Sequence, residues 1–270
     1  MHQGNYDLAE SELRRQIGKL APSSPFFAGN HGFLGDVEVA RGNLDRAIPH
    51  FEDAVRAYNA RPWFGADAML QGAQVYLERG DPRGVLAFTD RLPNPWRSGV
   101  RGIADLLLGK NAEAEVEFSA LKTSVSLVMG DVIANQAERL CRGWAAYYSH
   151  KPAEAIAHLS ATPFPYRMLT ALPLGRAYLE QDDLAHAEEE LSFVLKSQFM
   201  WGLVGWWERH NMLTLLLAHY YLGELCEKQG RFREAASHYR EFYSHFQHSK
   251  ARLPQIAAAR LALRRISVAR

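Results

Sequence analysis

Few residues of this chain have the types and spacing that catalysis requires. Ser119-Ala-Leu-Lys122 matches the Ser-x-x-Lys string in which a serine serves as nucleophile. The string is short and common, and its surroundings predict an ordinary helix. A Leu-Leu-Leu-Gly run ends at Lys110 without the Ser or Thr of a phosphate loop, and Gly-x-Ser-x-Gly and Gly-x-Gly-x-x-Gly are absent. We therefore predict that the chain is not an enzyme and needs no cofactor.

Metal-binding patterns are also weak, although the chain has 11 histidines. His245 and His248 are three residues apart and share a helix face, but no carboxylate or cysteine accompanies them closely. We predict a solvated helix end there, a solvated face at Glu188–Glu190, and no metal site. Cys141 and Cys226 lie far apart and match no metal spacing, which favours a reduced, cytoplasmic chain.

The formal net charge is +1, so no global field favours nucleic acid. The segment from Lys250 to Arg270 is nevertheless basic and contains no acid. One interpretation is phosphate binding through Arg260, Arg264 and Arg265; the favoured one is a capping helix whose arginines reach solvent. The most apolar run, from Phe199 to Trp207, is nine residues long and too short to cross a bilayer, so no membrane association is expected.

The strongest pattern is an internal period, which predicts the elements that would position any site. Seven times a small residue precedes a large apolar residue by four positions, most clearly at Ala47, Ala187 and Ala235, and more loosely at Ala9, Val85, Ala114 and Ala155. A Leu-Gly pair lies upstream of the three clear copies. Small residues let two helices approach closely, and glycines such as Gly42 and Gly230 fall where a helix must end.

This pattern resembles the tetratricopeptide repeat, a helix-turn-helix of about 34 residues. The sixth copy supplies Leu174, Gly175, Tyr178, Leu184, Ala187, Leu191 and Val194. The resemblance implies an all-α fold, a right-handed α-solenoid of stacked antiparallel helix pairs with about six and a half repeats. The expected single domain, residues 1–270, comprises a half repeat (1–20), repeats at 28–60, 62–93, 96–122, 131–162, 166–198 and 208–248, and a closing helix at 254–267, with loops that include 21–30.

The final sixty residues are similar to the repeat region that ends large bacterial signalling proteins. The chain opens with a turn and second helix whose partner helix is missing, so we expect a longer protein upstream. Apolar residues of this half repeat (Tyr6, Leu8, Leu13 and Ile17) would lack a cover on one side. A second copy of the chain would cover them, which predicts a homodimer through residues 1–17.

In the family, partners bind at fixed positions of the first helices, which line the concave face. Those positions predict the binding residues Gln71, Gln74, Leu140, Trp144, Tyr147, Tyr148, Arg176, Tyr220, Tyr221 and Glu224. Their aromatic content suits an apolar or proline-containing peptide, and the alternative is that the aromatics pack between repeats. The Lys and Asn that clamp a C-terminal carboxylate in some relatives are absent. Trp201, Trp206 and Trp207 are either core or an interaction patch.

The sequence thus predicts a non-catalytic protein-interaction module of a bacterial regulatory or signalling protein. Two alternatives stay open. A ligand sensor for a small molecule or signalling peptide predicts a closed pocket around Trp144, Tyr148 and Arg176. A self-assembly module predicts a symmetric contact through residues 1–17.

Overall fold

The computed structural model describes residues 5–57, 66–92, 96–162, 167–197 and 211–268. Helices occupy most of this part of the chain, and no strand occurs in it, so the predicted all-α class is confirmed. The chain divides into two compact units, residues 1–138 and 139–270, and each is described here by itself. A single domain therefore stays a prediction. Within the described ranges, no helix is long and apolar enough to cross a membrane.

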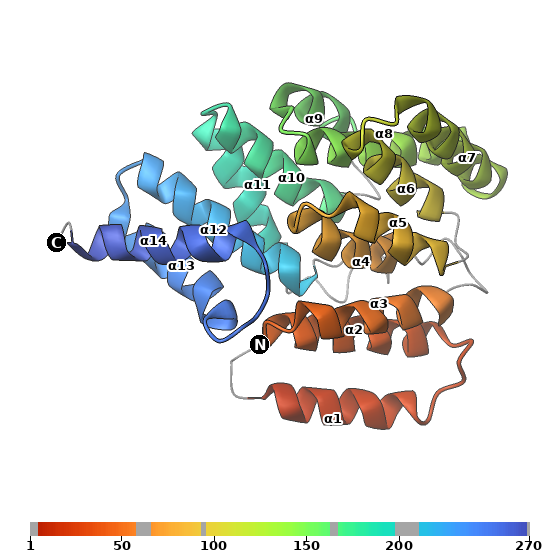
Figure 1. Ribbon diagram of the computed structural model, residues 1–270, viewed down its shortest axis with the longest axis horizontal. Helices are drawn as coiled ribbons and strands as arrows, with labels where there is room; N and C mark the ends of the chain where they lie inside the picture. Colours follow the sequence, from red (N-terminus) through yellow and green to blue (C-terminus); the bar gives the residue numbers. More distant parts are fainter. Residues whose placement is uncertain (1–4, 58–65, 93–95, 163–166, 198–210, 269–270) are drawn as a thin grey trace. The chain divides into compact units, whose positions relative to one another are not determined.

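The first unit consists of one unpaired helix and three helix pairs, followed by the beginning of α8. Neighbouring helices pack side by side, and Figure 1 shows α1, α2 and α3 running back and forth beside one another. The helices are α1 (Tyr6–Ile17), α2 (Pro25–Ala40), α3 (Leu44–Ala57), α4 (Ala66–Glu78), α5 (Pro82–Asp90), α6 (Trp96–Leu107) and α7 (Asn111–Met129), and α8 spans Asp131–Tyr148.

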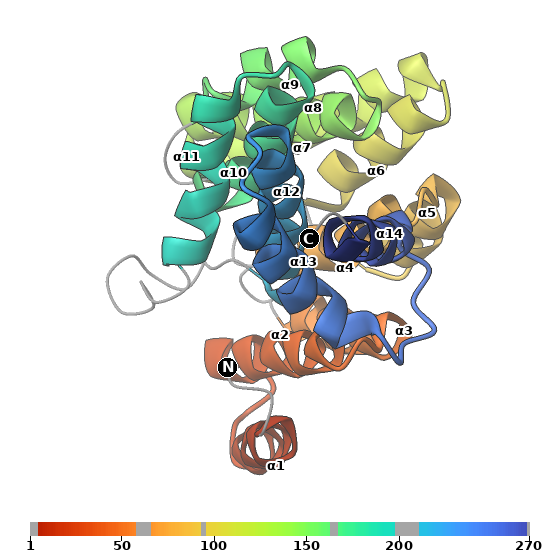
Figure 2. The same cartoon turned by 90° about the vertical axis from the view of Figure 1, so that its left-hand side faces the viewer.

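The second unit continues the same arrangement from the later part of α8 and ends in a single helix. Figure 2 shows this last helix, α14, nearly end-on beside α13, against which it packs. The helices are α9 (Pro152–Leu159), α10 (Arg167–Glu180), α11 (Leu184–Ser197), α12 (Met212–Lys228), α13 (Phe232–Phe246) and α14 (Pro254–Val268).

Each helix pair closes at a point where a glycine of the first helix faces a large side chain of the second. A Cβ on Gly35 would lie 2.4 Å from Cε1 of Phe51, so only glycine fits this approach. The relationship recurs with the same spacing in all six described pairs: Gly35–Phe51, Gly72–Phe88, Gly102–Phe118, Gly143–Leu159, Gly175–Leu191 and Gly223–Tyr239. Sequence analysis found only the three glycines that follow a leucine. The other three glycines make the same contact without a leucine before them. The large side chain on the second helix leaves no room for a Cβ, whatever residue precedes the glycine.

The pair formed by α4 and α5 departs from the predicted register. Its large residue is Phe88, three positions after Val85 rather than four, because the stretch from Gly72 to the turn at Gly80 is one residue longer than in the other pairs. The extra residue explains why this copy is weak in the sequence.

The turn inside each pair is built in one way. Its central residue has a left-handed backbone, with φ between 55 and 75° at Gly42, Gly80, Gly109, His150, Asp182 and Gly230. In the first pair, the Gly42 N–H donates to the Val39 carbonyl and the Asn43 N–H to the Glu38 carbonyl, each at 2.8 Å. This bond pattern satisfies carbonyls that the end of a helix leaves without partners. The left-handed turn fixes where the second helix starts, and so aligns the glycine with its large partner.

One detail of the first unit differs from the expectation, and the exposure of α1 agrees with it. Residues 25–30, expected within a loop, belong to α2, because Pro25 suits a first helical position and Ser24 caps the helix by accepting from the Phe26 N–H at 3.3 Å. No residue of α1 is fully buried, and Leu8 is 66% exposed. Its apolar side is covered in part by α2.

Candidate functional site

The second unit contains an open groove of about 840 Å³ whose sides are formed mainly by α10, α12 and α14. Arg176 and Glu180 line it from α10, one helical turn apart. Tyr221 and Glu224 line it from α12, and α14 contributes the small side chain of Ala258. Three helices that are neighbours only after folding therefore build one surface.

Arg176 is held in a fixed orientation beside this groove. Its guanidinium carbon lies 4.7 Å from the centre of the Tyr147 ring and 5.5 Å from that of Tyr221. Its Nε donates to Glu180 Oε1 at 2.8 Å, and its Nη2 lies 3.1 Å from Nδ1 of His150. Aromatic faces attract the guanidinium, and a planar donor held this way loses little entropy when it binds.

Acidic side chains of the groove are matched by donors of the same unit. The Tyr220 hydroxyl donates to Glu224 Oε1 at 2.6 Å, and burial raises the pKa of Glu224. The Tyr239 hydroxyl donates to Glu227 Oε2 at 2.8 Å, and Arg265 Nη2 donates to Glu227 Oε1 at 2.7 Å. The groove thus offers paired charges of both signs rather than one strong charge, while its tyrosines Tyr220, Tyr221 and Tyr239 are 6%, 4% and 2% exposed.

The closing helix forms one wall of this surface. Gln255 Nε2 donates to the Tyr221 hydroxyl at 3.4 Å, which ties the start of α14 to α12. Leu261 is 56% exposed and lines the groove, because α14 turns Ala259, Ala262 and Ile266 inward. Small alanines of α14 therefore lie against the neighbouring helices, and its leucine lies on the groove side.

The structure distributes the ten predicted binding residues unevenly. Four of them line the groove: Arg176, Tyr220, Tyr221 and Glu224. Tyr147 contacts the groove through Arg176, and its ring packs edge-on against Tyr148 at 4.6 Å. Tyr148 is half-buried. The remaining four, Gln71, Gln74, Leu140 and Trp144, are buried, as are Tyr147, Tyr220 and Tyr221. The Trp144 indole donates to the Leu169 carbonyl at 2.9 Å, as expected for an aromatic that packs between repeats.

Gln71 and Gln74 belong to α4 in the first unit, so they are considered apart from the groove. Gln71 is only 2% exposed, and its side-chain oxygen and nitrogen have no hydrogen-bond partner within the described ranges. Contact of the ten residues with a partner stays a prediction.

Two interpretations of charged side chains need correction. His245 is not solvated: its side chain is 5% exposed and its Nε2 lies 3.8 Å from Glu241, whereas His248 is exposed beyond the end of α13. Of the Glu188–Glu190 run only Glu189 is exposed. Glu188 accepts from Arg231 at 2.7 Å, and Glu190 pairs with Arg167. Both acids bridge separate helices, a role that the linear sequence did not reveal.

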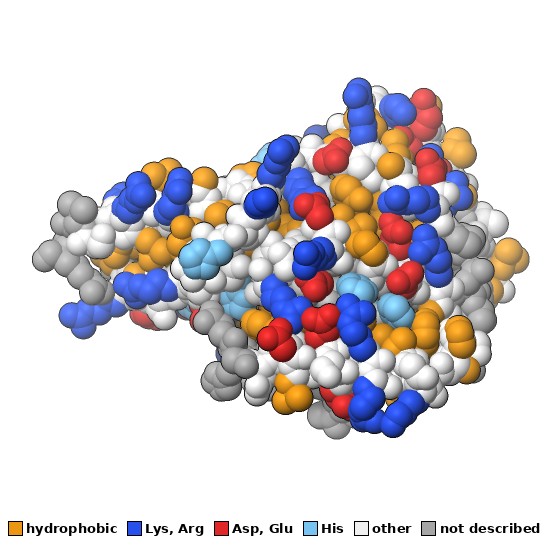
Figure 3. Space-filling model, turned by 60° about the horizontal axis from the view of Figure 1, so that its bottom comes forward, with side chains coloured by type: hydrophobic (Ala, Val, Ile, Leu, Met, Phe, Trp, Pro, Cys, Tyr) orange, Lys and Arg blue, Asp and Glu red, His pale blue; other side chains and the backbone are white. Residues whose placement is uncertain are grey.

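Other candidates have simpler outcomes. Ser119 and Lys122 are exposed on α7, which confirms the helix expected around them. Cys141 and Cys226 are buried. Trp201, Trp206 and Trp207 lie outside the described residues. Figure 3 shows basic and acidic side chains intermixed across one face, with histidines between them.

Sequence analysis missed one cluster in the first unit, formed by His31, His50 and Asp53. Its signal was present, since His50 and Asp53 are three residues apart on one helix and so share a face. The third member is on another helix, and no spacing rule connects it to the pair.

Stacked antiparallel helix pairs with a groove along their first helices define a helical-repeat protein. The sequence model of the tetratricopeptide repeat matches residues 34–82 in the first unit and 172–252 in the second. A solved tetratricopeptide repeat protein from Parabacteroides merdae ATCC 43184 is 15% identical, with a TM-score of 0.48, and the alignment covers 98% of this chain and 93% of that chain. No curated protein matches the chain.

Proposed function

We propose that the groove of the second unit binds an extended segment of another protein, and that the chain acts as a non-catalytic interaction module. Tetratricopeptide repeats are generally protein-interaction modules, which agrees with this role. The supporting observation is Arg176, whose guanidinium is already oriented between two tyrosine rings beside a groove of about 840 Å³. A donor fixed before binding suits backbone carbonyls, which every peptide carries.

The lining residues define the kind of segment. Glu180 and Glu227 are paired with Arg176 and Arg265, so the groove has little net charge to attract a strongly charged ligand. Leu261, which is 56% exposed, supplies apolar contact area. The segment we propose is therefore uncharged or weakly charged, with apolar or proline side chains between polar backbone groups.

The test blocks the groove and leaves the fold unchanged. Ala258 lines the groove, whereas Ala257 is exposed on the same helix and does not line it. Peptides are selected from a displayed library against the unaltered chain, and their affinities are measured by fluorescence anisotropy. Ala258→Trp should weaken binding at least about tenfold, or about 1.4 kcal/mol, and Ala257→Trp should not change it. Equal binding by both variants would contradict the proposal.

The roles in a bacterial signalling protein, in ligand sensing and in self-assembly stay predictions. The ligand sensor predicted a closed pocket around Trp144, Tyr148 and Arg176. Of these three residues, only Arg176 lines the open groove. Suppose that a peptide of more than a few residues binds, and that Ala258→Trp weakens this binding while Ala257→Trp does not. That result would favour the interaction module over a small-molecule sensor.

A further inference from the structure

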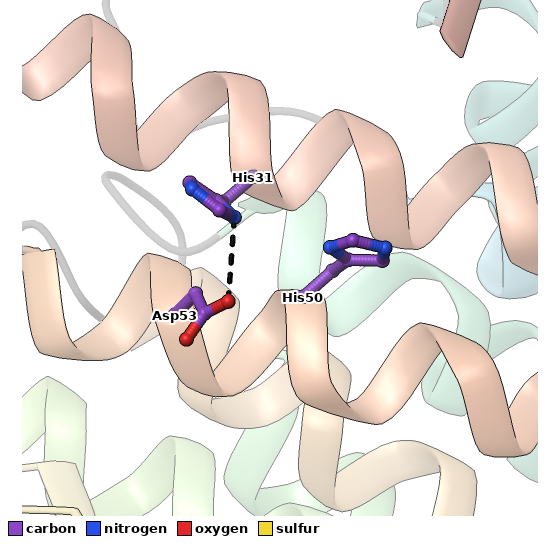
Figure 4. A group of neighbouring side chains, drawn as sticks. All are labelled: His31, His50 and Asp53. Atoms are coloured by element: carbon purple, nitrogen blue, oxygen red, sulfur yellow. Dashed lines mark ion pairs between the residues drawn. The ribbon is translucent and has the colours of Figure 1, made fainter. Parts of the chain in front are cut away.

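The α2–α3 pair of the first unit brings two histidines and a carboxylate together. His31 is on α2, and His50 and Asp53 are one turn apart on α3. Each offers one ligand atom, and these atoms lie within 4.8 Å of one another. Figure 4 shows His31 and Asp53 facing each other across the gap between the two helices, with the His50 ring beside them in the same gap.

We propose that His31, His50 and Asp53 bind a divalent transition-metal ion such as Zn²⁺. Two imidazoles and one carboxylate form a ligand set that zinc and its neighbours prefer, whereas Mg²⁺ and Ca²⁺ prefer oxygen ligands alone. The site is in the first unit and shares no residue with the groove of the second.

The distances agree with this ligand set. His31 Nδ1 lies 3.6 Å from Asp53 Oδ2. Two ligands of a tetrahedral zinc ion with bonds of about 2.0–2.1 Å lie about 3.3 Å apart. The His31 and His50 ring centres are 6.1 Å apart, so the rings flank a space between them rather than stack. All three ligand atoms lie within 4.8 Å of one another, so binding one tetrahedral ion requires them to move closer together.

One ring nitrogen of each histidine is buried without a hydrogen bond that would account for its position. Nδ1 of His31 and Nδ1 of His50 are buried, and neither has a hydrogen-bond partner among the described residues. A buried polar atom without a partner destabilises the fold, and an ion would satisfy both atoms at once.

Asp53 is oriented by a neighbour on its own helix. Arg56 Nη1 donates to Asp53 Oδ1 at 3.2 Å, while Oδ2 is the oxygen near His31. Hydrogen bonds from outside the ligand set fix the orientation of metal ligands in this way. The charge of Arg56 opposes a cation, so we expect moderate rather than tight affinity.

A cavity of about 510 Å³ borders the cluster, and His31, Asp53 and Arg56 are among its lining residues. The ion would therefore be reachable from solvent. Three protein ligands leave a fourth position for water or a small anion, which Arg56 would attract.

Isothermal titration of the metal-free full chain with ZnCl₂ tests the proposal. We expect one saturable site, with affinity at least tenfold weaker in both His50→Gln and Asp53→Asn, each checked for its helical circular dichroism. MgCl₂ should give no binding. Cobalt substitution gives a second readout, an absorption band that both variants should lose.

The chain offers a matched control. His186 and Asp183 are also three residues apart on the surface, with Nδ1 to Oδ2 at 2.7 Å, but the described residues supply no third ligand there. His186→Gln should bind zinc as the unaltered chain does. Absence of binding, equal binding in all variants, or a loss in His186→Gln as large as in His50→Gln would each overturn the proposal.

Discussion

Gly35 and Phe51 touch so closely that no side chain fits between them. A Cβ on Gly35 would lie 2.4 Å from Cε1 of the Phe51 ring, and this ring is 1% exposed and surrounded by core. Since the ring is packed on all sides, it has no space into which to move. The same contact in six helix pairs makes it the main constraint that fixes how closely the two helices of a repeat approach.

The first prediction compares two glycines of α2. Gly35→Ala should lower the free energy of unfolding by about 1–3 kcal/mol, because overpacking exceeds the helix propensity gained. Gly29→Ala, with nothing within 4 Å of its new Cβ, should raise it by up to about 1 kcal/mol. Urea unfolding followed by circular dichroism measures both, and shifts in the same direction would contradict the packing argument.

The second prediction concerns the left-handed turns. Asp182 has φ of 58°, a conformation that costs a non-glycine residue about 1–2 kcal/mol. Asp182→Gly should therefore raise the unfolding midpoint, even though the exposed ion pair with Lys228 is lost, since such pairs contribute at most about 1 kcal/mol.

Gly42, with φ of 75°, gives the reverse test. Gly42→Ala should lower the midpoint for the same reason. If both variants move the midpoint in one direction, backbone conformation is not the cause.

The third prediction is a pH dependence set by His219. Its Nδ1 lies 3.0 Å from Nδ1 of His238, with Glu241 and His245 nearby, and burial lowers its pKa to about 4. In the unfolded chain the pKa is about 6.5, so between these values the unfolded state binds more protons. The stabilising contribution is complete above about pH 6.5 and is lost as the pH falls toward 4, by at most about 3 kcal/mol.

Thermal unfolding at about pH 7 and pH 5 measures this effect. His219→Gln should reduce the loss of stability on acidification; it should not abolish it, because burial also lowers the pKa of His31, His50 and His238. His186→Gln, a change at a side chain that is 60% exposed, serves as the control and should keep the full loss. An unchanged pH dependence in His219→Gln would exclude His219 as the source.

The fourth prediction tests the expected homodimer. Leu8 on α1 is 66% exposed, and no residue of this helix is fully buried. If a second copy covers α1, light scattering will give twice the monomer mass, and a variant with Leu13→Ser and Ile17→Ser will give the monomer mass. A monomer in both cases would leave the groove as the place to look for partners.

The repeat pattern was readable because it is local. The turn residue, the small residue five positions later and the large residue after it lie within one helix-turn-helix, so helical geometry alone relates them. Gly72, Gly102 and Gly143 escaped notice because the residues before them differ, although the packed side chain opposite is what requires them. The weak copy at Val85 was misaligned because its first helix has one extra residue before the turn.

The sequence by itself determined that the chain is helical, where most turns lie and which residues close three of the six described pairs, since these follow from periods of three to four residues and from the conformational freedom of glycine. Only the tertiary structure decided which side chains share a site. Arg176 meets Tyr221 across two helices, and His31 meets Asp53 across another two. Such meetings depend on the angle and register at which helices pack, and these arise from contacts between residues far apart in the chain.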